Sequence, residues 1–268
     1  MPSARRKGEK LLAPVHPNAG VEAEYRRRLV RLVDEMAASY LYWVKATYRA
    51  NEPAIAQDET PAVALKRRIS RLGAQWTKKF DQAADDLAKW FAEAASKRSS
   101  AALRSILKKG GFSVEFKLTP AVRDILQATI AENVSLIKSI PSQYLTNVEG
   151  LVMRSVTAGR DLAQLTKDLQ EQHGVTRRRA SRIALDQNNK ATAAITRARQ
   201  VDLGITEAIW VHSGGGKHPR PTHLKAGRER TKYTIKDGWY DPAVGKNIWP
   251  GELVNCRCVC RAVVPGFS

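Results

Sequence analysis

The chain has 268 residues, with 45 lysines and arginines against 26 acidic residues, so its formal net charge is +19. Hydrophobic residues make up 43% of it, which is ordinary for a globular protein. This composition excludes a chain that is disordered along its whole length. So large a positive charge favours a polyanionic neighbour, because basic surfaces release counterions from phosphates and bind nucleic acid whatever its sequence. No apolar run approaches the roughly 20 residues that span a bilayer, so we expect neither a membrane span nor a secretory signal.

The first 20 residues are interpreted as a basic arm, because they combine proline and glycine with cations and show no hydrophobic period. The cations of this arm are Arg5, Arg6, Lys7 and Lys10. Residues 21–111 are predicted to be a region of long helices. Over residues 21–50 apolar positions recur at spacings of three and four, which is typical of an amphipathic helix. The opposite face of this helix is basic and includes Arg27, Arg28, Arg31 and Lys45.

A second long helix is predicted after a break at residues 51–61, with Thr60 as its N-cap and Pro61 as its first helical residue. The apolar stripe then continues to a Lys-Lys-Gly-Gly stop at residues 108–111. Large aromatic residues at helical spacing are typical of a core. We therefore expect Trp43, Trp76 and Trp90 to pack between these helices.

Residues 112–204 are predicted to form a compact helical bundle. Residues 112–118 alternate as a short strand would, and Thr119 with Pro120 then opens a helix. Beyond it we expect short helical pieces, interrupted at Pro141, near Gly159 and at Gly174. One helix start concentrates cations at Arg177, Arg178, Arg179 and Arg182. These arginines form either a solvated face or a contact with DNA or a partner, since guanidinium groups bind phosphates and carboxylates bidentately.

After residue 204 helical periodicity stops, and residues 205–268 are predicted to form a separate C-terminal module. Residues 205–213, 231–235 and 256–264 read as strands, with a glycine loop at residues 214–216. A small antiparallel sheet with long loops is the economical interpretation. The predicted fold class is therefore α+β, with a mainly helical N-terminal region followed by this small module.

Three closely spaced cysteines, Cys256, Cys258 and Cys260, lie in the chain's last predicted strand. In a strand alternate side chains share one face, so the three thiols would point the same way and, with His223, could bind zinc. The spacing is not that of a standard zinc finger. The alternatives are that these thiols are small buried core residues, as free cysteines usually are, or that they crosslink to a partner.

An enzymatic interpretation also stays open. Cys256 could act as a nucleophile with His223 as its base, or His212, His223 and Asn255 could form a metal-dependent nuclease site. The sequence carries no paired carboxylates at metal-binding spacing and no glycine-framed serine, P-loop or dinucleotide fingerprint. We therefore expect a protein that is not an enzyme.

A set of motifs in the second half of the chain resembles the phage Mu F-like minor head proteins, the head morphogenesis family. Upstream, the resemblance covers residues 132–134 and 136–141. It then rests on the helical stretch at residues 182–192, Gly204-Ile205, Trp210, Arg220-Pro221-Thr222-His223, Pro250 and Asn255-Cys256-Arg257-Cys258. Each motif alone is weak, but their ordered combination is specific.

The resemblance implies a minor capsid protein of a tailed phage, associated with the portal protein inside the head, with the major capsid or scaffold protein as a further candidate partner. It also implies a location in the virion at the portal vertex, after synthesis in the host cytoplasm. The charge of the chain independently favours double-stranded DNA, bound without sequence specificity. We expect the DNA contacts at Arg5, Arg6, Lys7, Lys10, Arg27, Arg28, Arg177, Arg178 and Arg179.

Overall fold

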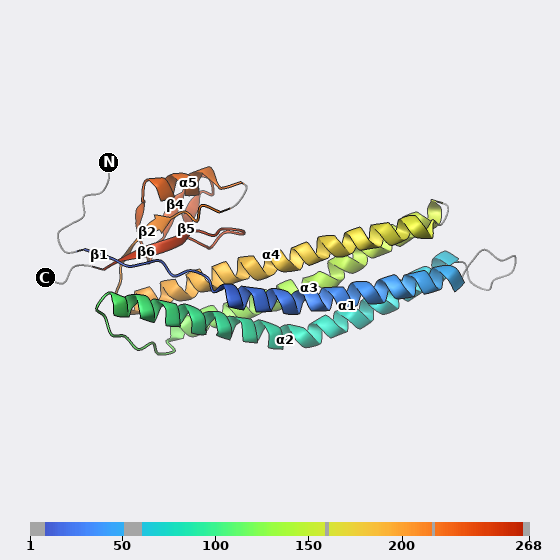
Figure 1. Cartoon of the computed structure of the whole chain (residues 1–268), viewed down its shortest axis with the longest axis horizontal. Coiled ribbons are helices and arrows are strands. Elements are labelled where there is room, and N and C mark those ends of the chain that lie inside the picture. Colours follow the sequence, from blue (N-terminus) through green and yellow to red (C-terminus); the bar gives the residue numbers. More distant parts are fainter. Residues whose placement is uncertain (1–8, 51–60, 159–160, 216–217, 265–268) are drawn as a thin grey trace. The chain divides into compact units, whose positions relative to one another are not determined.

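Long helices followed by short strands make up the part of the chain that the computed structural model describes, residues 9–50, 61–158, 161–215 and 218–264 (Figure 1). The helices are α1 (Ala19–Ala50), α2 (Pro61–Lys109), α3 (Pro120–Thr157), α4 (Leu162–Asp202) and α5 (Pro221–Arg228). The strands are β1 (Lys10–Leu11), β2 (Glu207–Val211), β3 (Lys232–Thr234), β4 (Trp239–Asp241), β5 (Lys246–Ile248) and β6 (Val259–Val264). The predicted α+β class is confirmed. None of the helices in the described residues carries an apolar stretch long enough to cross a bilayer.

The starts of the long helices follow from local capping. Asn18 Oδ1 accepts a hydrogen bond from the N–H of Val21 at 3.0 Å, and Asp161 Oδ1 accepts two from the first turn of α4. Thr119 caps α3 with Pro120 at its first position, as the sequence predicts. A side-chain oxygen at an N-cap satisfies a backbone donor that the helix itself leaves without a partner.

Two helices end at glycines in the left-handed region. Gly111 after α2 has φ +90° and Gly204 after α4 has φ +70°. The next residues, Phe112 and Ile205, each donate their N–H to the carbonyl five residues earlier, at 2.9 Å. This is the Schellman motif, which needs a residue that tolerates positive φ. Both helix stops agree with the prediction from sequence.

The chain packs into two compact units. The sheet unit comprises Met1–Glu22, Trp90–Ile130 and Leu185–Ser268, and the helical unit comprises Ala23–Lys89 and Ala131–Ala184. Each unit is therefore assembled from stretches that are far apart in the sequence, and each of the four long helices contributes residues to both.

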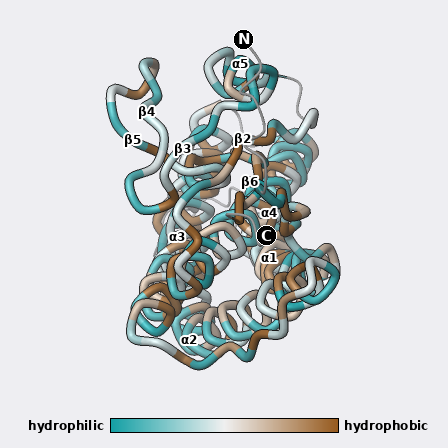
Figure 2. The backbone as a smooth tube through the Cα atoms, turned by 90° about the vertical axis from the view of Figure 1, so that its left-hand side faces the viewer, coloured by the Kyte–Doolittle hydropathy of each residue, from teal (hydrophilic) through white to brown (hydrophobic). Residues whose placement is uncertain are grey.

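The core of the helical unit consists of residues that recur along the inner faces of its helices. Figure 2 shows the corresponding alternation of hydrophobic and hydrophilic stretches along the helices. Tyr25 donates a hydrogen bond to Asn133 Oδ1 at 2.8 Å, and the rings of Tyr40 and Tyr144 meet edge to face at 5.3 Å. Its largest fully buried residues are Tyr25, Tyr40, Tyr144, Phe80, Leu29, Met36, Leu65, Ile69 and Ile137.

The predicted packing differs among the three tryptophans, of which Trp90 is half-buried. Trp76 is buried at 6% exposure, as expected. Trp43 is 38% exposed, and the guanidinium of Arg68 lies 4.5 Å from its ring centroid. A cation over an indole ring is favourable at the surface as well. The prediction that Trp43 is buried was therefore wrong, although its helical spacing is the one expected of a core residue.

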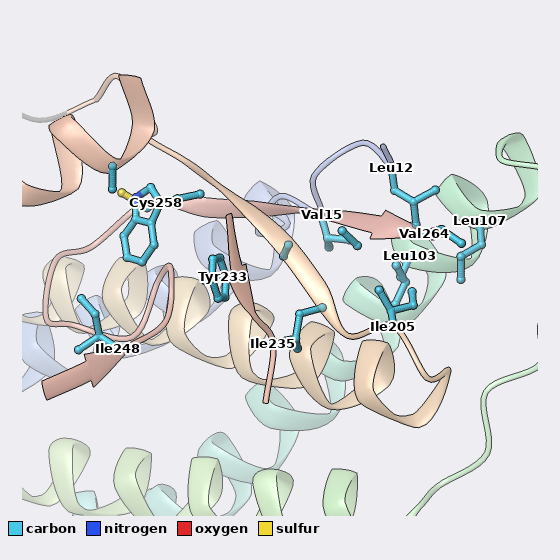
Figure 3. Packing of buried hydrophobic residues seen from close by; sticks show 14 of the residues in the cluster. Leu12, Val15, Leu103, Leu107, Ile205, Tyr233, Ile235, Ile248, Cys258 and Val264 are labelled. Atoms are coloured by element: carbon cyan, nitrogen blue, oxygen red, sulfur yellow. The ribbon is translucent and has the colours of Figure 1, made fainter. Parts of the chain in front are cut away.

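The sheet unit is built on a four-stranded antiparallel sheet in the order β1-β6-β2-β3, beside the β4-β5 hairpin. Trp210 in β2 pairs with Cys260 in β6, and Lys10 in β1 pairs with Val264. Figure 3 shows Leu12, Val15 and Val264 converging with Leu103 and Leu107 of α2. Residues 10–15 of the predicted basic arm therefore belong to the sheet and its core.

Two local expectations were wrong. Residues 112–118 are not a strand: their alternating burial is real, but Phe112, Val114 and Phe116 pack against the core without pairing to another strand. The helices also run unbroken through Pro141 and Gly174. A glycine costs a helix only about 1 kcal/mol, and Pro141 is itself buried, so packing outweighs both breaks.

Candidate functional site

His223 and two of the three cysteines meet inside the sheet unit. His223 lies in α5, which begins at Pro221, and Cys256 and Cys258 lie in the loop that leads into β6. The three residues are 2%, 3% and 5% exposed, respectively. His223 Nδ1 lies 3.5 Å from Cys256 Sγ and 3.8 Å from Cys258 Sγ. All three atoms lie within 4.8 Å of one another, close enough to share one metal ion.

Asp241, at the end of β4, occupies the other side of the imidazole. Its side chain is fully buried, and its Oδ2 lies 3.3 Å from His223 Nε2. His223 Nε2 makes no hydrogen bond that meets the usual geometric criteria, so its approach to Asp241 is a close polar contact. Thr222 donates to the same oxygen at 3.2 Å, and the N–H of Ala243 donates to the other at 2.9 Å.

Sequence reasoning missed Asp241. The signal available was the Asp-Pro step followed by glycine at Gly245, which indicates a turn that an aspartate begins. That pattern predicts the Asx turn, but it does not say that the carboxylate is buried against a histidine.

The two thiols are electrostatically coupled. The hydrogen bond between Cys256 and Cys258, and then the one between Cys256 and His223, lower the pKa of the Cys256 thiol against the opposing effect of burial. The pKa of Cys258 is raised, first by its hydrogen bond to Cys256 and then by burial. The backbone at Gly251 lowers the pKa of Cys256 further, and the backbone at Ser213 partly opposes the increase at Cys258. The environment therefore favours a thiolate at Cys256 and a neutral thiol at Cys258.

Cys260 does not join this cluster. Its Sγ lies 3.8–3.9 Å from the side-chain amide of Gln200, and burial raises the pKa of its thiol. The prediction that three cysteines share one face assumed a strand from residue 256, whereas β6 begins only at Val259. The structure thus brings together His223, Cys256 and Cys258, and places Cys260 elsewhere.

The helical motif at residues 182–192 holds the cysteine loop. Asp186 Oδ1 accepts the backbone N–H of Asn255 at 2.5 Å, and Asn255 itself has φ +60°, which asparagine tolerates. Gly251 passes so close to α4 that an added Cβ would lie 2.8 Å from that of Ala193. Arg220 donates from the other side to the carbonyl of Val254 at 3.0 Å. The motifs that are distant in sequence therefore meet at one loop.

Aromatic residues close the site. The Trp210 ring meets His223 edge to face at 4.9 Å and lies 5.1 Å from the Trp239 ring. Trp210 Nε1 has no hydrogen bond of normal geometry, but it is near enough to Cys258 to lower the pKa of that thiol. The neighbouring cavity, which Cys258 and Cys260 help to line, has a volume of about 30 Å³. His223 and Cys256 are not among the residues that line it.

The residues predicted to contact DNA have different environments. Arg27 and Arg28 are exposed and both pair with Glu24, at 2.5 and 2.7 Å. Arg177 pairs with Asp34 at 3.3 Å.

The other predicted DNA contacts differ from these. Arg178 is exposed, but Arg179 is half-buried and donates to Ser139 Oγ at 2.8 Å, so it is tied to the helical unit's interior. Lys10 donates to the carbonyl of Gly110. Arg5, Arg6 and Lys7 lie outside the described residues.

Two basic hollows in the helical unit were not predicted as such. One has a volume of about 580 Å³ and lies between α1 and α4, lined by Arg26, Arg27, Arg31 and Arg177 together with Asp34 and Glu35. The other, of about 330 Å³, lies between α1 and α2 and is lined by Arg67, Arg68 and Arg71 beside Trp43. Helical spacing in the sequence predicts which arginines share one face of a helix. It does not predict which arginines of two different helices lie together.

Comparison with known proteins identifies the region that holds the site. Residues 146–261 match a family model described as Phage Mu protein F like protein. Over this region the chain is similar to the phage Mu F-like family. The predicted resemblance is thereby confirmed, and the match includes His223, Cys256 and Cys258. A role in the phage head is the function that this family supports.

One relative is an uncharacterized protein of Haemophilus influenzae, 32% identical over 185 residues. The alignment covers 66% of this chain and 38% of that protein, so the Mu F-like chain spans well under half of its relative. No solved structure matches the chain.

Proposed function

We propose that this Mu F-like chain is a minor head protein of a tailed phage, located inside the capsid at the portal vertex, where it binds packaged DNA without sequence specificity. It is made in the host cytoplasm and enters the particle during assembly. The observation that carries the proposal is the family match over residues 146–261. The portal protein is the proposed partner, with the major capsid or scaffold protein as a further one.

The motif residues support a scaffolding role rather than catalysis. Arg220, Thr222, Asp186 and Asn255 all bind neighbouring segments of the same unit, as the hydrogen bonds above describe. His223 is 2% exposed and does not line the cavity beside Cys258. Among the described residues, the cluster close enough to bind one metal ion does not include His212. We therefore propose that the module is not an enzyme.

The surface charge supports the DNA contact. The hollow between α1 and α4 has arginines from both helices along its length, and two of them, Arg27 and Arg177, are among the predicted DNA contacts. A phosphate could compete for these arginines with Asp34, since exposed ion pairs contribute only about 0–1 kcal/mol. A bound duplex is the polyanion that a virion interior supplies.

Particle composition tests the proposed location. Purified virions, analysed by mass spectrometry, should contain the protein in few copies, and detergent-dissociated particles should release it together with portal rings. Virions that lack the protein, or portal rings that never co-purify with it, would contradict the proposal.

The salt dependence of DNA binding tests the proposed contact. For duplex DNA, the slope of log K against log salt falls in magnitude by about 0.9 for each phosphate that the protein no longer neutralises. The double variant Arg27→Gln/Arg28→Gln should therefore lower the slope by about 1–2 for two unrelated DNA sequences alike. The matched control is Lys225→Gln/Lys246→Gln, which removes two exposed cations from the sheet unit. An equal decrease in both double variants, or no salt-sensitive binding, would refute the assignment.

Incubation with plasmid and Mg²⁺ or Mn²⁺ tests the enzymatic alternative. We expect no cleavage. Cleavage that disappears in His223→Ala would overturn the non-catalytic role.

A further inference from the structure

The spacing of the three ligand atoms in the sheet unit matches a metal tetrahedron. With Zn–S bonds of about 2.3 Å and a Zn–N bond of about 2.0–2.1 Å, tetrahedral angles separate N from S by about 3.6 Å. His223 Nδ1 lies 3.5 Å from Cys256 Sγ and 3.8 Å from Cys258 Sγ. These two distances agree with a tetrahedral metal site, and the two sulfurs lie within 4.8 Å of each other.

The second side of the imidazole carries the partner that such a ligand requires. A histidine that binds metal through one nitrogen usually donates the other N–H to a carboxylate, which fixes its tautomer and orientation. Asp241 Oδ2 lies 3.3 Å from Nε2, in a fully buried position. An ordinary buried core histidine has no need of a buried carboxylate, whose burial is costly unless the charge is compensated.

Charge balance points the same way. Two thiolates neutralise a divalent cation, and the remaining charge of Asp241 is offset by the hydrogen bonds that Thr222 and the N–H of Ala243 donate to it. Thiolate and imidazole ligands in a tetrahedral arrangement favour zinc over magnesium or calcium, which prefer oxygen.

We propose that His223 Nδ1, Cys256 Sγ and Cys258 Sγ bind one zinc ion, and that Asp241 orients His223 from behind. Among the described residues no fourth histidine, cysteine or acidic side chain joins the cluster, so a water molecule completes the tetrahedron. The aromatic wall of Trp210 and Trp239 shields the ion. The ion would link α5 to the loop before β6, and the site does not depend on the proposed place in the virion.

Metal analysis of the purified full chain tests the site. After reduction and dialysis against trace zinc, the wild type should retain one zinc per chain, and replacement by Co²⁺ should produce thiolate-to-cobalt charge-transfer absorption. Cys256→Ser and Cys258→Ser should each lose stoichiometric zinc and that absorption. Cys260→Ser is the matched control and should keep both, because Cys260 lies with Gln200 instead.

Asp241→Asn separates orientation from ligation. It should bind zinc about 10–100-fold more weakly while the cobalt spectrum still reports two thiolates. Circular dichroism identifies any variant that fails to fold, and the wild-type metal content and cobalt spectrum decide the question without a variant. Reduced wild type that takes up neither metal stoichiometrically would overturn the proposal, as would a Cys260→Ser variant that loses zinc as completely as Cys256→Ser.

Discussion

Gly227 in α5 allows a test in which two physical effects have opposite signs. Replacing a helical glycine by alanine stabilises a helix by up to about 1 kcal/mol, because alanine loses less backbone entropy on folding. At Gly227, however, the new Cβ would lie 2.5 Å from the Cβ of His212 and 2.9 Å from its backbone nitrogen. Those atoms directly follow β2 and cannot swing aside. Overpacking of this kind costs about 1–3 kcal/mol, so after the helical gain is subtracted we expect Gly227→Ala to lower the free energy of unfolding by up to about 2 kcal/mol.

Gly174→Ala in α4 is the matched control. There the added Cβ would meet only the end of the Arg178 side chain, at 3.3 Å, which can move away. This variant should be more stable than wild type by about 0.5–1 kcal/mol. Thermal unfolding followed by circular dichroism measures both, with a shift of about 2–4 °C for each kcal/mol in a chain of roughly this size. If Gly227→Ala melted at or above the wild-type temperature, the close packing of α5 against β2 would be refuted.

Two further changes probe buried polar groups. Asp186→Ala removes the charged acceptor of the Asn255 N–H and should cost about 1.5–3 kcal/mol in urea unfolding; a decrease below about 0.5 kcal/mol would show that the bond contributes nothing. Burial raises the pKa of Tyr25, Tyr40 and Tyr144 above that of an exposed phenol, about 10. Because the folded-state pKa is the higher one, this stabilisation is complete below about pH 10 and is lost as the pH rises above it. Unfolding at about pH 9 and about pH 11 should show a smaller decrease in stability in Tyr25→Phe than in wild type, and equal decreases would contradict the reasoning.

Helix boundaries could be predicted where the signal is local. The starts at Pro61 and Pro120, and the stops at Gly111 and Gly204, all depend on a proline at the first turn or on a glycine with positive φ. These residues act through their own backbone, so the sequence alone is sufficient.

Packing decided the positions where prediction failed. Pro141 and Gly174 weaken a helix, but neither can end one that the unit's interior holds in place. The alternation at residues 112–118 reports burial of one face and not strand pairing, because an extended segment can bury alternate side chains without a neighbour. The sequence pattern around each of these residues carries no information about its contacts with distant parts of the chain.

The candidate site was predicted in part. His223, Cys256 and Cys258 were identified by residue type, since thiols and imidazole favour the same metals. Cys260 was grouped with them because alternate residues of a strand share one face. Residues 255–258 are not in a strand, as the φ of +60° at Asn255 shows, so the alternation does not apply to Cys256 and Cys258. Asp241 belongs to a hairpin that no sequence motif connects to α5.

The pairing of β1 with β6 has a consequence for the order of folding. Lys10 pairs with Val264, so the four-stranded sheet joins two segments that are synthesised far apart in time. The helical unit, by contrast, is complete once Ala184 has left the ribosome. Contacts between distant segments form slowly because the intervening loop must first be closed. We therefore expect the helical unit to form during translation. The segment around Leu12 can pair with β6 only after β6 has been synthesised.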